Sequence, residues 1–154
     1  MTRTWADHLP PGVVRKLERH FVSPPDLVDV VVRSIRFEHR GPGCTLRLDL
    51  PGPVQCNLGF MAVEDVRLNG GPLPDTVTIS LSPLPLPRLA VTVTGTSTRL
   101  SLTCADQLRF GRVSTHPTPP AEVDTGPHVF DSKLDQRLYT TVPGPEVHTY
   151  HERF

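Results

Sequence analysis

The sequence has no excess of either charge and no long apolar run. Its 154 residues include 16 Lys and Arg and 16 Asp and Glu, so the formal net charge is zero. A balanced charge argues against the strongly basic surface with which proteins bind nucleic acid. No apolar run approaches the ~20 residues needed to span a bilayer, and the N-terminal segment 1–5 lacks the apolar core of a secretory signal. We therefore expect a cytoplasmic protein that binds neither membranes nor nucleic acid.

Cysteine is also scarce, and familiar catalytic or cofactor-binding motifs are missing. The three cysteines are Cys44, Cys56 and Cys104. An odd number of cysteines without a signal peptide predicts reduced thiols. Cys44 and Cys104 fall at positions of their predicted strands that point inward, so we expect them to be small buried side chains. There is no glycine-rich phosphate loop, nucleophile elbow, Cys-x-x-Cys or His-Glu-x-x-His. His148 and His151 lie close together but lack further ligands at zinc-binding spacing. We expect no metal, no cofactor and no enzymatic activity.

What the sequence does contain is a series of short runs in which apolar and polar residues alternate. Val77, Ile79 and Leu81, for example, alternate with Thr78 and Ser80. Such alternation predicts strands with one buried and one solvent-facing side. Turn residues divide positions 30–114 into about seven such strands, and no helical pattern lies between them. The predicted fold is therefore mainly β: an antiparallel meander of short strands, curved or folded as a sandwich, with one N-terminal helix packed on it.

The ends of the chain differ in character from this central region. A helix is predicted over Pro11–Phe21, because Val13, Val14, Leu17 and Phe21 recur at helical spacing. Beyond it the prediction is a domain at 1–115, a proline-rich linker at 116–130 and a C-terminal extension at 131–154 with a short helix near its start. The buried anchors expected before the helix are Trp5 and Leu9.

Two sets of residues are candidates for binding a partner. The first set lies at outward strand positions and comprises Arg33, Arg47, Asp49, Arg99 and Arg109. Arginine is favoured at interfaces because its planar fork binds carboxylates in bidentate fashion, although solubility and cross-strand pairing explain such residues equally well. The second set lies in the tail and comprises His148, Tyr150, His151 and Phe154. A terminal segment of this kind can fold on binding.

The order of these segments resembles the immunity protein 50 family of bacterial polymorphic-toxin systems. The similar parts are Trp5-Ala6-Asp7, the helix ending at Pro24-Pro25, the predicted hairpin spanning 32–51, the string 63–70 and the closing strand pair around Leu100 and Phe110. This resemblance covers roughly residues 1–115 and implies a non-enzymatic antidote that binds a cognate protein toxin. The region at 53–58 is shorter than the family pattern, and the tail after His116 is an addition to it.

Two other functional classes stay open beside the immunity function. One is a binding or structural module of a larger bacterial assembly without antitoxin activity, which a gene neighbourhood lacking a toxin would favour. The other is an enzyme with a site in a β-sandwich cleft. That class requires titratable side chains that converge in one pocket, and sequence spacing alone reveals no such convergence.

Overall fold

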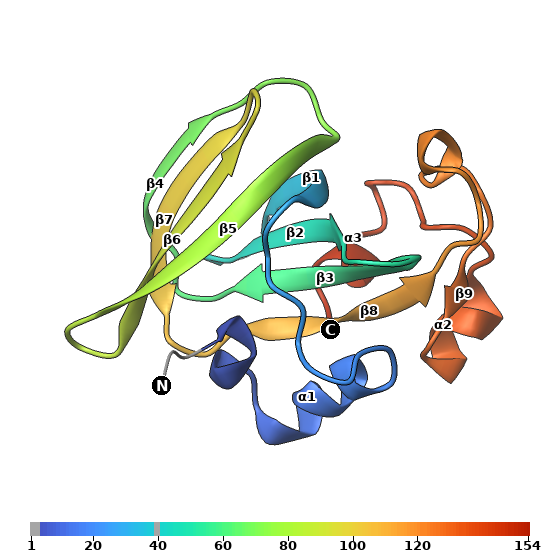
Figure 1. Ribbon diagram of the computed structural model, residues 1–154, viewed down its shortest axis with the longest axis horizontal. Coiled ribbons are helices and arrows are strands. Elements are labelled where there is room, and N and C mark those ends of the chain that lie inside the picture. Colours follow the sequence, from blue (N-terminus) through green and yellow to red (C-terminus); the bar gives the residue numbers. More distant parts are fainter. Residues whose placement is uncertain (1–3, 39–40) are drawn as a thin grey trace.

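A computed structural model describes residues 4–38 and 41–154 and contains one nine-stranded antiparallel sheet (Figure 1). The strands are β1 (Val30–Phe37), β2 (Cys44–Asp49), β3 (Val54–Phe60), β4 (Glu64–Asn69), β5 (Asp75–Leu84), β6 (Arg88–Gly95), β7 (Arg99–Ala105), β8 (Arg109–Thr115) and β9 (Val129–Phe130). Their spatial order is β4-β7-β6-β5-β1-β2-β3-β8-β9. The mainly β, antiparallel fold class predicted from the alternation is thus confirmed.

The strand count and connectivity differ from the expected meander in one informative place. The stretch 58–68, expected as a third strand with a break near Glu64-Asp65 as an alternative, is divided between β3 and β4, which lie far apart in the sheet. Ala62 and Asp65 have φ values of 50° and 53° there, so the backbone turns away from β3. β4 then pairs with β7 and forms one edge of the sheet, while β3 pairs with β8. Alternation predicts that residues are extended, but it does not reveal which strand they pair with.

The core lies on the apolar side of the sheet, beneath the N-terminal elements. These are the 3₁₀ turn η1 (Trp5–His8) and the helix α1 (Pro11–Glu18). Trp5 is buried, its indole N–H donates to the Pro25 carbonyl at 2.8 Å, and its ring centroid lies 5.8 Å from that of Phe110. Leu9 and Leu17 are also buried. The predicted helix and its Trp5 and Leu9 anchors are therefore confirmed.

The apolar phase expected for the first strand, Val31, Ile35 and Phe37, is interrupted by Arg33, which predicts either a bulge or an edge position. The register of β1 against β2 shifts between Val32 and Ser34, which marks a bulge. Val30 and Val32 face the core, and beyond the shift Ile35 and Phe37 pair with the buried Leu46 and Cys44, so they lie on the same side of the sheet. Phe37, the last residue of the strand, is nevertheless 42% exposed. Of the two alternatives at Arg33 the structure shows the bulge, and Val31, which pairs with Asp49, lies on the opposite side from Ile35 and Phe37.

The segment after β8 returns to the sheet. It contains the 3₁₀ turn η2 (Pro120–Glu122), strand β9, and the short helices α2 (Lys133–Leu138) and α3 (His148–His151). β9 lies within the expected linker and pairs with Ser114 and Thr115 of β8. Figure 1 shows α3 beside β2 and β3, and α2 beside β9. Within the described ranges, no helix is long and apolar enough to cross a membrane.

Candidate functional site

The side of the sheet opposite the core carries polar residues throughout, but its two halves have different surroundings. We call the outward side of β2, β3 and β8 the covered face, because the chain after His116 packs on it. We call the outward side of β4, β6 and β7 the open face. It is formed by Arg67, Asn69, Thr92, Thr94, Arg99 and Ser101. Of the sequence-predicted arginines, Arg47 lies on the covered face, with Arg33 at its margin, and Arg99 lies on the open face. Arg109 lies at the start of β8.

Arg47 lies at the centre of the covered face and is only 3% exposed. Its guanidinium donates to Gln55 Oε1 at 2.6 Å and to Asn57 Oδ1 at 3.0 Å. It also donates to the Arg112 carbonyl at 2.6 Å and to Ser114 Oγ at 3.1 Å. Every one of these acceptors is neutral, and burial lowers the pKa of Arg47 from its usual value. The expectation that Arg47 lies on a solvent-facing surface is wrong, because the tail covers it.

Arg33 and Asp49 form the margin of the same polar cluster. Arg33 donates two hydrogen bonds to Asp49 Oδ2, at 2.7 and 3.0 Å, and lies 3.5 Å from Asp124. Gln55 Nε2 donates to the other oxygen of Asp49 at 2.8 Å, which connects the ion pair to Arg47. Burial lowers the pKa of Arg33, but its hydrogen bonds with Asp49 and the charge of Asp49 outweigh burial, so the pKa lies above its usual value. Arg33 and Asp49 are thus paired with each other.

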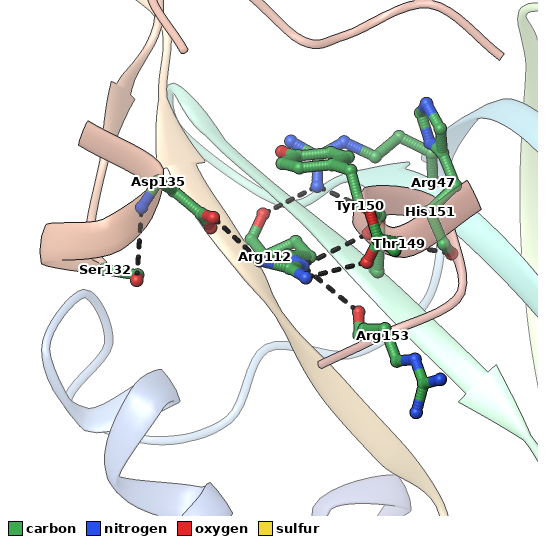
Figure 2. Close-up of polar contacts among 9 residues, drawn as sticks. Arg47, Arg112, Ser132, Asp135, Thr149, Tyr150, His151 and Arg153 are labelled. Atoms are coloured by element: carbon green, nitrogen blue, oxygen red, sulfur yellow. Dashed lines mark hydrogen bonds and ion pairs between the residues drawn. The ribbon is translucent and has the colours of Figure 1, made fainter. Parts of the chain in front are cut away.

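Arg112 holds the tail in place, and the sequence reasoning missed it. Its φ of 50° turns the side chain out of the β8 ladder. Figure 2 shows it between α2 and α3, where it donates to Asp135 Oδ1 at 2.7 Å and to the Thr149 carbonyl at 2.8 Å. Its Nε donates to the carbonyls of Tyr150 and Arg153 at 3.1 and 3.2 Å. A signal was present, because an arginine continues the apolar phase of Leu108 and Phe110, which indicates a break in the strand.

The predicted tail residues lie mainly within this covered region. Tyr150 is fully buried, with the guanidiniums of Arg47 and Arg112 at 5.5 and 5.1 Å from its ring centroid. Its hydroxyl has no hydrogen-bond partner within the described residues. The Phe154 ring packs against Gly59 so closely that a Cβ at that position would collide with it. These aromatic side chains face the protein's own sheet.

The two tail histidines differ in their surroundings. His151 is buried, and its Nε2 lies 2.9 Å from the Pro143 carbonyl, a distance at which an Nε2–H donates. Burial lowers the pKa of His151, which favours the neutral ring. His148 is more exposed, with Nδ1 3.3 Å from Arg36 and 3.5 Å from Glu152. Across the described ranges, no group of three or more His, Cys, Asp or Glu side chains is placed to hold a metal ion.

Two further buried histidines lie under the edge of the tail. His128 Nδ1 lies 2.9 Å from Ser114 Oγ and its Nε2 lies 2.8 Å from the Val123 carbonyl. The carbonyl can only accept, so Nε2 carries the proton and Nδ1 accepts from the serine hydroxyl. His116 packs against His128 with ring centroids 5.6 Å apart. Burial lowers the pKa of both histidines.

All three cysteines lie in the core, as the sequence predicts for Cys44 and Cys104. Cys44, Cys56 and Cys104 are buried free thiols. Burial raises the pKa of Cys44 and of Cys56 to about 12 and that of Cys104 to about 11. A thiol reacts as the thiolate, so these three groups are protonated and unreactive at neutral pH.

The open face contains Arg99, the first residue of β7, the strand next to the edge strand β4. It lies opposite Asn69 of β4, and Arg67 lies opposite Ser101 of β7. The side chains of Arg67 and Arg99 make no hydrogen bond or ion pair within the described part of the chain. They line a depression of about 540 Å³ together with Thr92, Thr94, Asn69 and Ser101. Arg67 was not singled out from the sequence, although it occupies an outward position in the alternating string 66–69.

Arg109 lies at the start of β8, away from both clusters. Its guanidinium is 3.7 Å from Glu38 and 5.8 Å from the centroid of the Phe154 ring. The five predicted residues therefore do not form one site: Arg33, Arg47 and Asp49 interact with one another, Arg99 is on the open face, and Arg109 is beside the C-terminal residue.

A comparison of the chain with protein-family models and with curated proteins found no match to either.

Proposed function

We propose that this chain is a protein-binding module and that its partner is a cognate bacterial toxin, as the resemblance to the immunity protein 50 family implies. The observation that supports a binding function best is the open face. Two arginines whose side chains have no partner among the described residues lie there beside a depression, and Thr92, Thr94 and Arg99 on this side of the sheet are exposed. Desolvating a charged group without a partner is costly, so such a surface favours a partner that supplies carboxylates.

The edge strand next to the depression extends this surface. Every residue of β4 is exposed, including Leu68 at 47%. An edge strand presents backbone groups that can pair with an added strand. The proposed interface therefore combines β4 with Arg67 and Arg99, and its partner presents an acidic, partly extended segment. In this proposal the chain acts in the cytoplasm, where its three buried thiols stay reduced.

The test uses the toxin domain encoded next to this gene. We expect co-expression to restore growth and the two proteins to copurify. The double variant R67E/R99E should lower the affinity at least ~30-fold, since two charge-assisted hydrogen bonds are replaced by repulsion. Arg137, an exposed arginine on α2, gives the matched control R137E. Unchanged affinity in a folded R67E/R99E protein would show that the open face is not the interface.

The tail residues His148, Tyr150, His151 and Phe154 are the second proposed contact. Their insertion into a toxin cleft requires the tail to leave the covered face, which opens the hydrogen bonds of Arg112. Hydrogen exchange of the tail amides in the complex distinguishes the two interfaces. Faster exchange on binding supports the tail, and unchanged protection supports the open face. A neighbouring gene without a toxin domain would favour the alternative, a module of a larger assembly.

A further inference from the structure

A second cavity lies at the opposite end of the sheet from the open face. It has a volume of about 740 Å³ and lies between α1, α2 and the edge of β8. The cationic side chains that line it include Arg15 and Lys16 of α1, Arg19 directly after this helix, and Lys133 of α2. A volume of this size is typical of sites for small molecules. The site is therefore separate from the open face in both place and shape.

The charges in this cavity are unbalanced. Its two carboxylates have partners: Asp131 lies 2.7 Å from His20 Nε2, and Asp135 lies 2.7 Å from Arg112. By contrast, the side chains of Arg15, Arg19 and Lys133 make no hydrogen bond or ion pair within the described residues. Three unpaired cations thus lie around one concave space, which creates a local positive potential although the chain as a whole is neutral.

The fourth cation, Lys16, is fixed at the base of the cavity. Its Nζ donates to the Phe110 carbonyl at 3.2 Å and is partly buried. Burial and, to a smaller degree, the charge of Arg112 lower its pKa, while Asp135 opposes this. A bound anion would attract each of these cations and so offset their mutual repulsion. Phe154 also lines this space, and its backbone lies close to Gly111 of β8.

We propose that this cavity binds a small, multiply charged anion of the diphosphate class. Guanidinium forks match the oxygens of a phosphoryl group in bidentate fashion, and several cations at separate points favour a ligand with more than one charge. The concave shape between two helices fits a compact ligand better than a protein surface.

The test is a titration of the full chain with three probes, followed by calorimetry and thermal unfolding. The probes are inorganic orthophosphate, inorganic pyrophosphate and ADP. We expect pyrophosphate and ADP to bind and to raise the midpoint of thermal unfolding, with orthophosphate weaker than both. Tighter binding of ADP than of pyrophosphate assigns the ligand to organic diphosphates, and equal binding assigns it to the inorganic ion. No binding of pyrophosphate or ADP at millimolar concentration would overturn the proposal.

Variants identify where the probe binds. R15Q/R19Q should weaken pyrophosphate binding at least ~10-fold, because each substitution removes a charged hydrogen-bond donor, whereas R137Q, an exposed arginine of α2 outside the cavity, should not. Equal losses in both variants would show non-specific attraction and contradict the site. Tighter binding of a polyglutamate peptide than of pyrophosphate would assign the cavity to an acidic protein and also overturn it. The proposal is independent of toxin binding, because R67E/R99E should bind pyrophosphate normally.

Discussion

The covered and open faces are two halves of one polar surface with opposite energetic roles. Both are built from outward residues of neighbouring antiparallel strands, and each contains an arginine near its centre. Arg47 on the covered face has four hydrogen-bonded acceptors and almost no exposure, whereas Arg99 on the open face has no partner within the described residues. The difference is due to the tail, which packs on one half of the sheet and leaves the other uncovered (Figure 1).

This difference shows that strand alternation predicts on which side of the sheet a residue lies, but not whether that side is exposed. A polar residue at an outward position lies on the far side of the sheet from the core, but that side is exposed only where nothing packs on it. The covered face behaves as a second, polar core, with aromatic side chains of the tail stacked on it. Its side chains stabilise the fold, while those of the open face are available to a partner.

The largest expected effect comes from substituting the two central arginines in turn. Arg47→Met leaves the buried acceptors Gln55, Asn57 and Ser114 without their donor, so we expect the free energy of unfolding to fall by about 3–5 kcal/mol. Arg99→Met should change it by less than about 0.5 kcal/mol. Urea unfolding of both variants measures the contrast. Similar losses in the two variants would contradict the division into a covered and an open face.

Tyr150 tests how the tail is attached. Tyr150→Ala removes a fully buried ring between Arg47 and Arg112, and we expect a loss of about 3 kcal/mol. Tyr150→Phe retains the ring and removes a hydroxyl with no partner in the described part of the chain, so stability should be unchanged or higher by up to about 1 kcal/mol. A clear loss in the phenylalanine variant would mean that the hydroxyl makes a stabilising interaction.

The buried histidines of the covered side predict acid sensitivity. Burial lowers the folded-state pKa of His116, His128 and His151, so the unfolded chain binds protons first as the pH falls below about 6.5. The free energy of unfolding should therefore fall by at most about 1.4 kcal/mol per pH unit for each histidine, until the folded-state pKa is reached.

His151→Gln isolates one of these contributions. The glutamine amide retains a donor for the Pro143 carbonyl but does not titrate. Urea unfolding at pH 8 should give similar stability for both proteins, and the fall between pH 6.5 and pH 5 should be shallower in the variant. An identical slope would show that His151 does not contribute to the acid sensitivity.

The smallest effect is expected at the edge of the open face. Leu68 on β4 is half exposed, whereas its cross-strand neighbour Leu100 is buried. Leu68→Lys should change the free energy of unfolding by no more than about 0.5 kcal/mol, while Leu100→Ala should cost about 2–5 kcal/mol. Thermal and urea unfolding provide the measurement. A large loss from Leu68→Lys would place β4 within the stabilising core.

The sequence by itself determined the N-terminal helix, the extended segments and many of the residues that form the core. The periodicity of Leu17 and its neighbours determined α1, and alternating residues determined the extended segments and the burial of Cys44 and Cys104. These features follow from interactions between residues a few positions apart, which a linear pattern records. The charge that interrupts the apolar phase at Arg33 left a bulge and an edge position as alternatives, and the structure has the bulge.

Only the tertiary structure decided which polar residues form a site. It placed β4 beside β7 and not beside β3, and it brought residues after His116 onto the outer side of β2, β3 and β8. As a result Arg47 and Arg99, indistinguishable in their local sequence patterns, have opposite exposure. The physical reason is that exposure depends on contacts between segments about 100 positions apart, such as Asn57 with Tyr150, which no local periodicity encodes.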